Sequence, residues 1–198
     1  HPKRFGAFAF LPLPDVDAAL AEIARVFDDL KLDGICLLTS VDERYIGHPD
    51  FWPVFEELNR RKAVVFIHPC YPPGTEARGW DIPRMLIDYP FETTRVATNL
   101  IFNGVAEKLP DIKFILSHAG GTLPMLAHRI SLFDKKTKQQ GNYPKGALHY
   151  IARFYYDTAL SGHAAPLDAL AAFVPPSQIL FGTDYPYVSE DIAIAETK

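Results

Sequence analysis

The stretch ILFGTDYP, residues 179–186, is an apolar run that ends at a glycine and then presents a carboxylate, Asp184. An aspartate at the end of such a run is unusual, because Asp is rarely buried unless it is paired or binds a metal. The pattern occurs twice more with histidine, in VVFIHP (64–69) with His68 and in FILSHAGG (114–121) with His118. Three apolar runs that each end in a potential metal ligand or proton carrier point to a shared site.

The composition is that of a soluble globular protein, with 48% hydrophobic and 22% charged residues among 198. This length suits a single domain over residues 1–198. A formal net charge of −4 offers no basic face for nucleic acid and no polybasic anchor for a membrane. No apolar run approaches the roughly 18 residues of a membrane-spanning helix. The charge and the apolar runs therefore predict no nucleic-acid or membrane partner. With only two cysteines, the chain is expected to lack disulfides and to be cytoplasmic.

Apolar runs alternate with stretches of helical periodicity along the chain. Strands are expected over residues 6–12, 34–40, 64–69, 114–118, 154–159 and 178–184. Helices are expected over residues 15–30, 50–61, 91–108 and 166–174, and after Pro124. In the first helix Val16, Leu20 and Ile23 recur at helical spacing after Asp15, an expected N-cap. Because the apolar runs are nearly continuous, the strands are expected to be buried on both faces of a parallel sheet.

Two α/β architectures fit this alternation: an open doubly wound sheet and a (β/α)8 barrel. In both, functional residues gather at the C-terminal ends of strands, where His68, His118 and Asp184 would lie. No glycine-rich phosphate loop follows an expected strand, which weakens the nucleotide-binding form of the open sheet. The barrel is therefore favoured, although six strands do not close one and complete barrels usually need about 250 residues.

Five segments, in this order, resemble the amidohydrolase superfamily, and most closely its aminocarboxymuconate-semialdehyde decarboxylase-like branch of metal-dependent enzymes. They are HPKRFGAFAFLPLPD (1–15), VVFIHP (64–69), DYPFETTR (88–95), LPDIKFILSHAGGTLPMLAHRI (109–130) and ILFGTDYPY (179–187). The resemblance implies a (β/α)8 barrel of the metal-dependent hydrolase type, here with about six βα units. It also implies one divalent metal ion at the C-terminal ends of the strands, with Zn²⁺ expected first and Mn²⁺ second.

By position, the resemblance implies that His68 and Asp184 bind the metal and that His118 and Asp184 take acid/base roles. Arg129, eleven residues after His118, matches a position where relatives place an arginine that binds the substrate carboxylate. That arginine often serves a neighbouring subunit's site, so the resemblance implies a homodimer. The alternative for Arg129 is an exposed or salt-bridged helix face.

Three other side chains are candidates from their own positions. Trp80 and Tyr71 lie in the proline- and glycine-rich segment of residues 70–83, where loops often carry binding residues, and are candidates to cover an aromatic substrate. Asp157 follows an expected strand and either lines the pocket or caps the next turn. The expected substrate-binding set is therefore Arg129, Trp80 and Asp157.

One feature of the family is missing from the sequence. The family's first strand carries an H-x-H or E-x-H pair that supplies two further metal ligands, and no such pair occurs here. The chain is therefore expected to begin near the family's third strand and to end early in its eighth helix. Metal sites usually use about three or more protein ligands, so His68 and Asp184 alone would hold a catalytic metal weakly.

The residues predict a metal-dependent decarboxylase, a carbon–carbon lyase, for an aromatic or unsaturated carboxylic acid. Such a reaction needs a proton delivered to carbon, which suits a histidine at a strand end. It also needs charge stabilisation as CO₂ leaves, which suits a metal ion and an arginine that grips a carboxylate. Two alternatives stay open: a metal-dependent hydrolase or hydratase of the same superfamily, and a catalytically incomplete fragment that associates with a full-length subunit.

Overall fold

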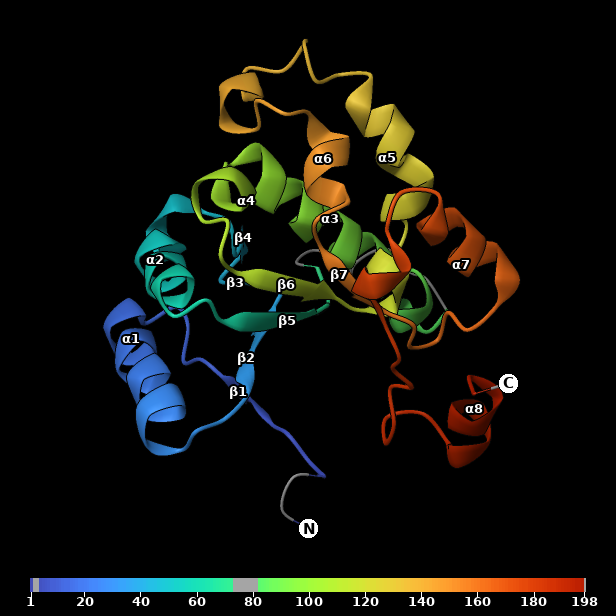
Figure 1. The fold of residues 1–198 in the computed structure, drawn as a ribbon, viewed down its shortest axis with the longest axis horizontal. Helices are drawn as coiled ribbons and strands as arrows, with labels where there is room; N and C mark the ends of the chain where they lie inside the picture. The colour runs from blue at the N-terminus through green and yellow to red at the C-terminus, as the bar shows by residue number, and fades with distance from the viewer. Residues whose placement is uncertain (2–3, 73–81, 198) are drawn as a thin grey trace.

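Six parallel strands form the central sheet of the protein in a computed structural model that describes residues 1, 4–72 and 82–197 (Figure 1). The strands are β1 (Phe8–Phe10), β2 (Gly34–Leu38), β5 (Val64–His68), β6 (Lys113–Leu116), β7 (Tyr155–Asp157) and β8 (Ile179–Leu180). Each overlaps one of the expected runs, and every neighbouring pair is parallel, as predicted.

The strand order along this sheet is β1-β2-β5-β6-β7-β8, which follows the chain without a reversal. A doubly wound sheet reverses its order at a switch point and carries helices on both faces. Here the helices follow one another in an arc along the outer side of the sheet (Figure 1). The fold is therefore an incomplete (β/α)8 barrel of six βα units, as predicted.

Eight α-helices are described. They are α1 (Val16–Ala24), α2 (Trp52–Arg60), α3 (Asp88–Phe102), α4 (Val105–Lys108), α5 (Leu123–Ser131), α6 (Ala147–Ile151), α7 (Ala164–Ala171) and α8 (Glu190–Ala195). The five expected helical stretches are confirmed, and Asp15 caps α1 by accepting a 2.9 Å hydrogen bond from the Ala18 amide. The short helix α6 was not predicted, whereas α8 lies where the chain was expected to end, early in the family's eighth helix. None of the helices in the described part of the chain is both long and apolar enough to span a membrane.

A small antiparallel hairpin, β3 (Ser40–Val41) and β4 (Arg44–Tyr45), was also not predicted. Its two-residue turn places Asp42 and Glu43 at positive φ, 47° and 62°. Asn-Gly or Asp-Gly sequences are typical of such turns, and Asp-Glu is not. The sequence therefore gave no hairpin signal at this point.

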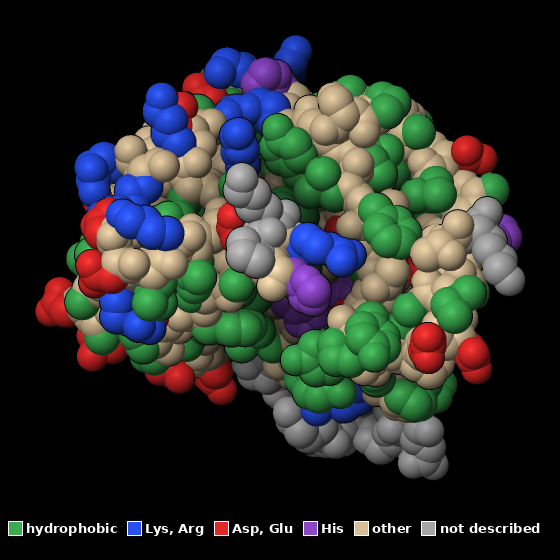
Figure 2. All heavy atoms as spheres, turned by 60° about the horizontal axis from the view of Figure 1, so that its bottom comes forward, with side chains coloured by type: hydrophobic (Ala, Val, Ile, Leu, Met, Phe, Trp, Pro, Cys, Tyr) green, Lys and Arg blue, Asp and Glu red, His purple; other side chains and the backbone are tan. Residues whose placement is uncertain are grey.

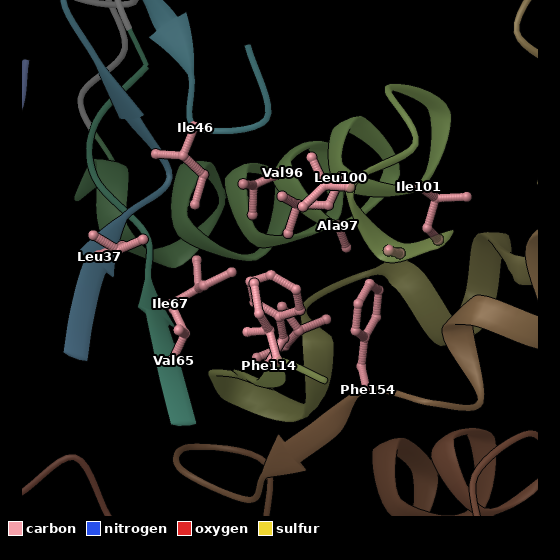
Figure 3. Packing of buried hydrophobic residues seen from close by; sticks show 14 of the residues in the cluster. Leu37, Ile46, Val65, Ile67, Val96, Ala97, Leu100, Ile101, Phe114 and Phe154 are labelled. Carbon is pink, nitrogen blue, oxygen red and sulfur yellow. The ribbon is translucent and has the colours of Figure 1, made fainter. Parts of the chain in front are cut away.

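The main hydrophobic core lies between the sheet and α3 (Figure 3). Buried side chains from both sides include Leu37, Val65, Ile67, Phe114, Val96, Ala97 and Leu100. Each large apolar side chain buried here contributes about 1.5–3 kcal/mol to stability. This packing fixes the strands whose C-terminal ends carry the candidate site.

Burial on both faces was expected for all strands, and it holds only in part. Residues 34–37 of β2 are buried, but in β1 Phe8 and Phe10 are 38% and 60% exposed. In β5, fully buried and half-buried residues alternate. β1 is an edge strand of the sheet and has a neighbouring strand on one side only. β5 lies inside the sheet, and its alternation shows that only one of its two faces is fully covered.

Candidate metal centre

Three side chains that the sequence singled out meet at the C-terminal edge of the sheet. His68 is the last residue of β5, His118 begins the short 3-10 turn His118–Gly120 after β6, and Asp184 follows β8. The parallel register aligns these ends, because Ile67 pairs with Leu116 and Asp157 pairs with Leu180. Parallel strands of neighbouring βα units therefore bring residues far apart in sequence to one place.

The distances within this cluster suit a single small ion. One ligand atom from each of His68, His118 and Asp184 lies within 4.8 Å of the others. Nε2 of His118 is 3.9 Å from Oδ2 of Asp184, and the two imidazole ring centroids are 5.6 Å apart. Within the described ranges this is the one group of three or more His, Cys, Asp or Glu side chains arranged to hold a metal.

The backbone at two of these residues is in the left-handed region. His118 has φ 56° and Asp184 has φ 62°. Non-glycine residues in this region cost about 1–3 kcal/mol each and persist only where the surrounding structure holds them. Positive φ also occurs in turns outside the cluster, such as that of Asp42 and Glu43, so at His118 and Asp184 it shows a constrained backbone and does not by itself assign a function.

The protonation states favour metal binding. Burial lowers the pKa of His118 to about 4, the charge of Asp184 acts in the opposite direction, and His68 lowers it further. His118 is therefore neutral near pH 7, the form that binds metals. Nδ1 of His68 lies 2.9 Å from the carbonyl oxygen of Pro69. If Nδ1 donates that hydrogen bond, Nε2 keeps its lone pair for a metal.

The donor set fits a divalent transition metal. His68 and Asp184 offer an imidazole nitrogen and a carboxylate oxygen, which both zinc and manganese accept, and His118 places a second imidazole within reach of the same ion. Nδ1 of His118 is buried and has no hydrogen-bond partner among the described residues. A buried ring nitrogen without a partner is rare in proteins and is consistent with a site completed by a further group.

Asp157 was expected either to line the pocket or to cap a turn. Its Oδ1 accepts hydrogen bonds from the amides of Ala159, at 3.1 Å, and His118, at 2.7 Å. The first bond caps the turn after β7. The second, which sequence reasoning missed, ties this carboxylate to the backbone of a candidate site residue. Burial raises the pKa of Asp157 to about 6, against the effect of these two amides and with a smaller contribution from Asp184.

The rings of Tyr89 and Tyr71 form an aromatic wall beside His68. The ring of Tyr89, in the first turn of α3, lies 5.8 Å from the imidazole of His68 and 5.0 Å from the ring of Tyr71. The guanidinium of Arg84 lies 4.2 Å from the Tyr71 ring centroid. Burial and a hydrogen bond with Tyr71 raise the pKa of Tyr89 to about 12, so it is neutral. In Figure 2, histidine side chains lie in the central hollow of the face shown, with a cationic and several hydrophobic side chains around them.

The remaining predicted residues are placed as follows. Trp80 lies outside the described residues. Arg129 lies on α5, where its side chain is exposed and forms no ion pair with any described residue. Tyr89 was missed, although it lies within the DYPFETTR segment, because nothing in its local sequence indicates that it faces His68.

The sequence matches one protein family and is similar to several known proteins. The family model described as "Amidohydrolase" matches residues 1–198. Decarboxylase macB of Penicillium terrestre is 43% identical over 94% of this chain and 59% of that protein. The 6-methylsalicylic acid decarboxylase acuB of Aspergillus aculeatus is 40% identical over 100% of this chain and 62% of that protein. The chain thus spans about three fifths of the length of these curated relatives.

A solved structure is similar along nearly the whole chain. It is a dihydroxybenzoic acid decarboxylase from Polaromonas sp. JS666 with bound manganese and the inhibitor 2-nitroresorcinol. It is 27% identical, with a TM-score of 0.85, and the match covers 99% of this chain and 63% of that one.

Proposed function

Because the chain belongs to the amidohydrolase family, we propose that it forms part of a metal-dependent decarboxylase, a carbon–carbon lyase that acts on an aromatic carboxylic acid. The observation that carries the proposal is the cluster of His68, His118 and Asp184, whose ligand atoms lie within 4.8 Å of one another at the strand ends. Relatives that are 43% and 40% identical are named decarboxylases, which supports this reaction over hydrolysis.

The metal would be held by His68 and Asp184, with His118 beside it. When bound, a divalent ion supplies charge stabilisation for the substrate and its carboxylate. Zinc is the expected ion from the sequence, and manganese is supported by the Polaromonas relative that binds it. Both ions accept the nitrogen and oxygen donors present here.

His118 would hold and transfer the proton of the reaction. Decarboxylation of an aryl carboxylate breaks the bond between the ring carbon and the carboxylate and forms a C–H bond at that carbon. A proton must therefore be delivered to the ring. Nε2 of His118 and Oδ2 of Asp184 are 3.9 Å apart, close enough for the two groups to share one proton between them through a small shift or a water.

The aromatic wall supports an aromatic rather than an aliphatic acid. The rings of Tyr89 and His68 are nearly perpendicular, and Tyr71 extends the aromatic surface beside them, so a planar substrate at the metal would lie next to aromatic side chains. Aromatic pairs in such geometries contribute about 0.5–1.5 kcal/mol beyond area burial. Trp80 and Asp157 stay proposed substrate-binding residues.

Arg129 would bind the substrate carboxylate in the site of a second subunit. It is exposed on α5 between Met125 and Leu132, which are 76% and 59% exposed. Exposed apolar residues around an arginine are typical of the core of a protein–protein interface. A homodimer through α5 is therefore part of the proposal, as are a single domain over residues 1–198 and a cytoplasmic location.

The direct test is CO₂ release by the protein reconstituted with Mn²⁺ or Zn²⁺ and supplied with 6-methylsalicylate or 2,6-dihydroxybenzoate. We expect CO₂ and the decarboxylated phenol in equal amounts, and no CO₂ from the His118→Gln variant. Cleavage of an aryl ester or lactone without CO₂ release from any acid would overturn the proposal in favour of a hydrolase. Metal binding without either reaction would favour a chain that lacks essential parts of the site.

A further inference from the structure

The turn that carries His118 has an unusual backbone over four consecutive residues. His118, Ala119, Gly120 and Gly121 all have positive φ, at 56°, 52°, 77° and 66°. Two of the four are not glycine, so this conformation costs free energy that the surroundings must offset. The direction in which the imidazole of His118 points depends on what holds this turn.

The turn is pressed against the first turn of α3. A Cβ atom at Gly121 would overlap the carbonyl oxygen of Pro90, and one at Gly120 would lie 2.6 Å from the ring of Tyr156. Only glycine permits both approaches. The turn therefore cannot move closer to α3. These steric contacts alone do not fix the position of the turn along the axis of α3.

Thr94 supplies the polar link between α3 and this turn. Its Oγ1 accepts a 2.9 Å hydrogen bond from the amide of Thr122, the residue that follows the turn, and lies 2.8 Å from the hydroxyl of Thr122. It also donates to the carbonyl oxygen of Pro90 at 2.8 Å. The carbonyl oxygen of Gly120, inside the turn, lies 3.5 Å from the same Oγ1 and is the more distant of two acceptors for its one proton. A hydroxyl has one proton and accepts two hydrogen bonds, so the contacts with Thr122 and Pro90 already use its full capacity. Thr94 is only 5% exposed, so water cannot easily replace a lost partner.

Other threonines of α3 do not make this link. Thr93 donates to the carbonyl oxygen of Tyr89, and Thr98 donates to that of Thr94, both within the same helix. At the opposite end of the turn, Asp157 on β7 accepts from the His118 amide. The turn is thus held at its first residue from β7 and just after its last residue from α3.

We infer that Thr94 is a positioning residue, which fixes the turn of residues 118–121 so that the imidazole of His118 stays within reach of His68 and Asp184. The inference rests on the proposed function only in taking His118 as a site residue. Residues that orient metal-site side chains through hydrogen bonds typically change metal affinity by about 10–100-fold when they are replaced.

The test compares three variants. Thr94→Val removes the hydroxyl and keeps the shape, Thr94→Ser keeps the hydroxyl, and Thr98→Val is the matched control on the same helix. Co²⁺ affinity and the Co²⁺ absorption spectrum of each protein are measured by titration, and amide hydrogen exchange is measured without metal. We expect Thr94→Val to weaken Co²⁺ binding about tenfold or more and to speed exchange at His118 and Thr122, with wild-type behaviour in Thr94→Ser and Thr98→Val.

The two readouts separate this inference from the proposed function. If wild-type protein binds no Co²⁺, the metal site fails as proposed, while amide exchange at His118 and Thr122 still decides the role of Thr94. Equal amide protection in Thr94→Val and Thr98→Val would overturn the inference. So would an equal loss of Co²⁺ affinity in those two variants, because it would indicate a general loss of stability.

Discussion

The amide of His118 donates a 2.7 Å hydrogen bond to Oδ1 of Asp157, so a buried carboxylate on β7 holds the backbone of a buried imidazole that follows β6. Burial acts on the two side chains in opposite directions. It lowers the pKa of His118 to about 4 and raises that of Asp157 to about 6. In both cases the charge of Asp184 raises the pKa as a smaller effect.

These shifts predict two opposing contributions to stability between about pH 4 and 6.5. The unfolded chain protonates His118 below about pH 6.5 and the folded protein only below about 4, so His118 costs stability as the pH falls through this range. Folded Asp157 keeps its proton up to about pH 6, whereas the unfolded chain releases it near 3.8. Its contribution is therefore full below about pH 3.8 and is lost as the pH rises through about 6.

Single variants should expose each contribution. Relative to wild type, His118→Gln should make the free energy of unfolding fall more steeply as the pH rises from about 4 to 6, because Asp157 then titrates alone. Asp157→Asn should have the opposite effect. Each change is bounded by about 1.4 kcal/mol per pH unit. Urea unfolding of metal-free protein measures the free energy of unfolding at each pH, with the exposed His128→Gln as control. If neither variant changes the pH dependence of this free energy, the pKa shifts of His118 and Asp157 are wrongly assigned.

Metal uptake should depend on His68 and Asp184. We expect about one equivalent of divalent metal per chain, because the cluster has room for one ion, and a loss of at least about tenfold in affinity for His68→Ala or Asp184→Asn. Elemental analysis measures the amount of metal per chain, and titration with Mn²⁺ and Zn²⁺ measures the affinity. His149→Ala, on α6, is the control, and metal retention by His68→Ala would show that the ion binds elsewhere.

Tyr89 should contribute to recognition of the aromatic ring. In Tyr89→Leu the aromatic ring beside His68 is lost, so the KM for an aromatic acid should rise about 2- to 12-fold, which corresponds to the roughly 0.5–1.5 kcal/mol of an aromatic pair. Tyr89→Phe keeps the ring and removes the hydroxyl, and should behave like wild type. Equal effects of the two substitutions would assign the role to the hydroxyl and its hydrogen bond with Tyr71 instead.

Much of this architecture is readable from the sequence, for a physical reason. A buried parallel strand needs a continuous apolar run, and the residue that ends the run necessarily lies at the functional edge, so His68, His118 and Asp184 could be predicted together. Tyr89 and Thr94 could not, because both lie on a helix whose rotation and depth are set by tertiary packing. The left-handed backbone at His118 could not be predicted either, because positive φ is uncommon at any single non-glycine residue, although histidine is enriched there.

Arg129 offers the sharpest test of the proposed dimer. If it serves the partner's site, Arg129→Gln and His118→Gln should each be inactive alone, while a refolded mixture of the two should regain activity. Random pairing gives half mixed dimers, each with one intact site, so about a quarter of wild-type activity is expected. Because Arg129 is exposed and forms no ion pair within the described chain, its substitution should change the free energy of unfolding by less than about 0.5 kcal/mol. No recovery in the mixture, with dimers shown by light scattering, would place Arg129 in its own subunit's site or outside any site.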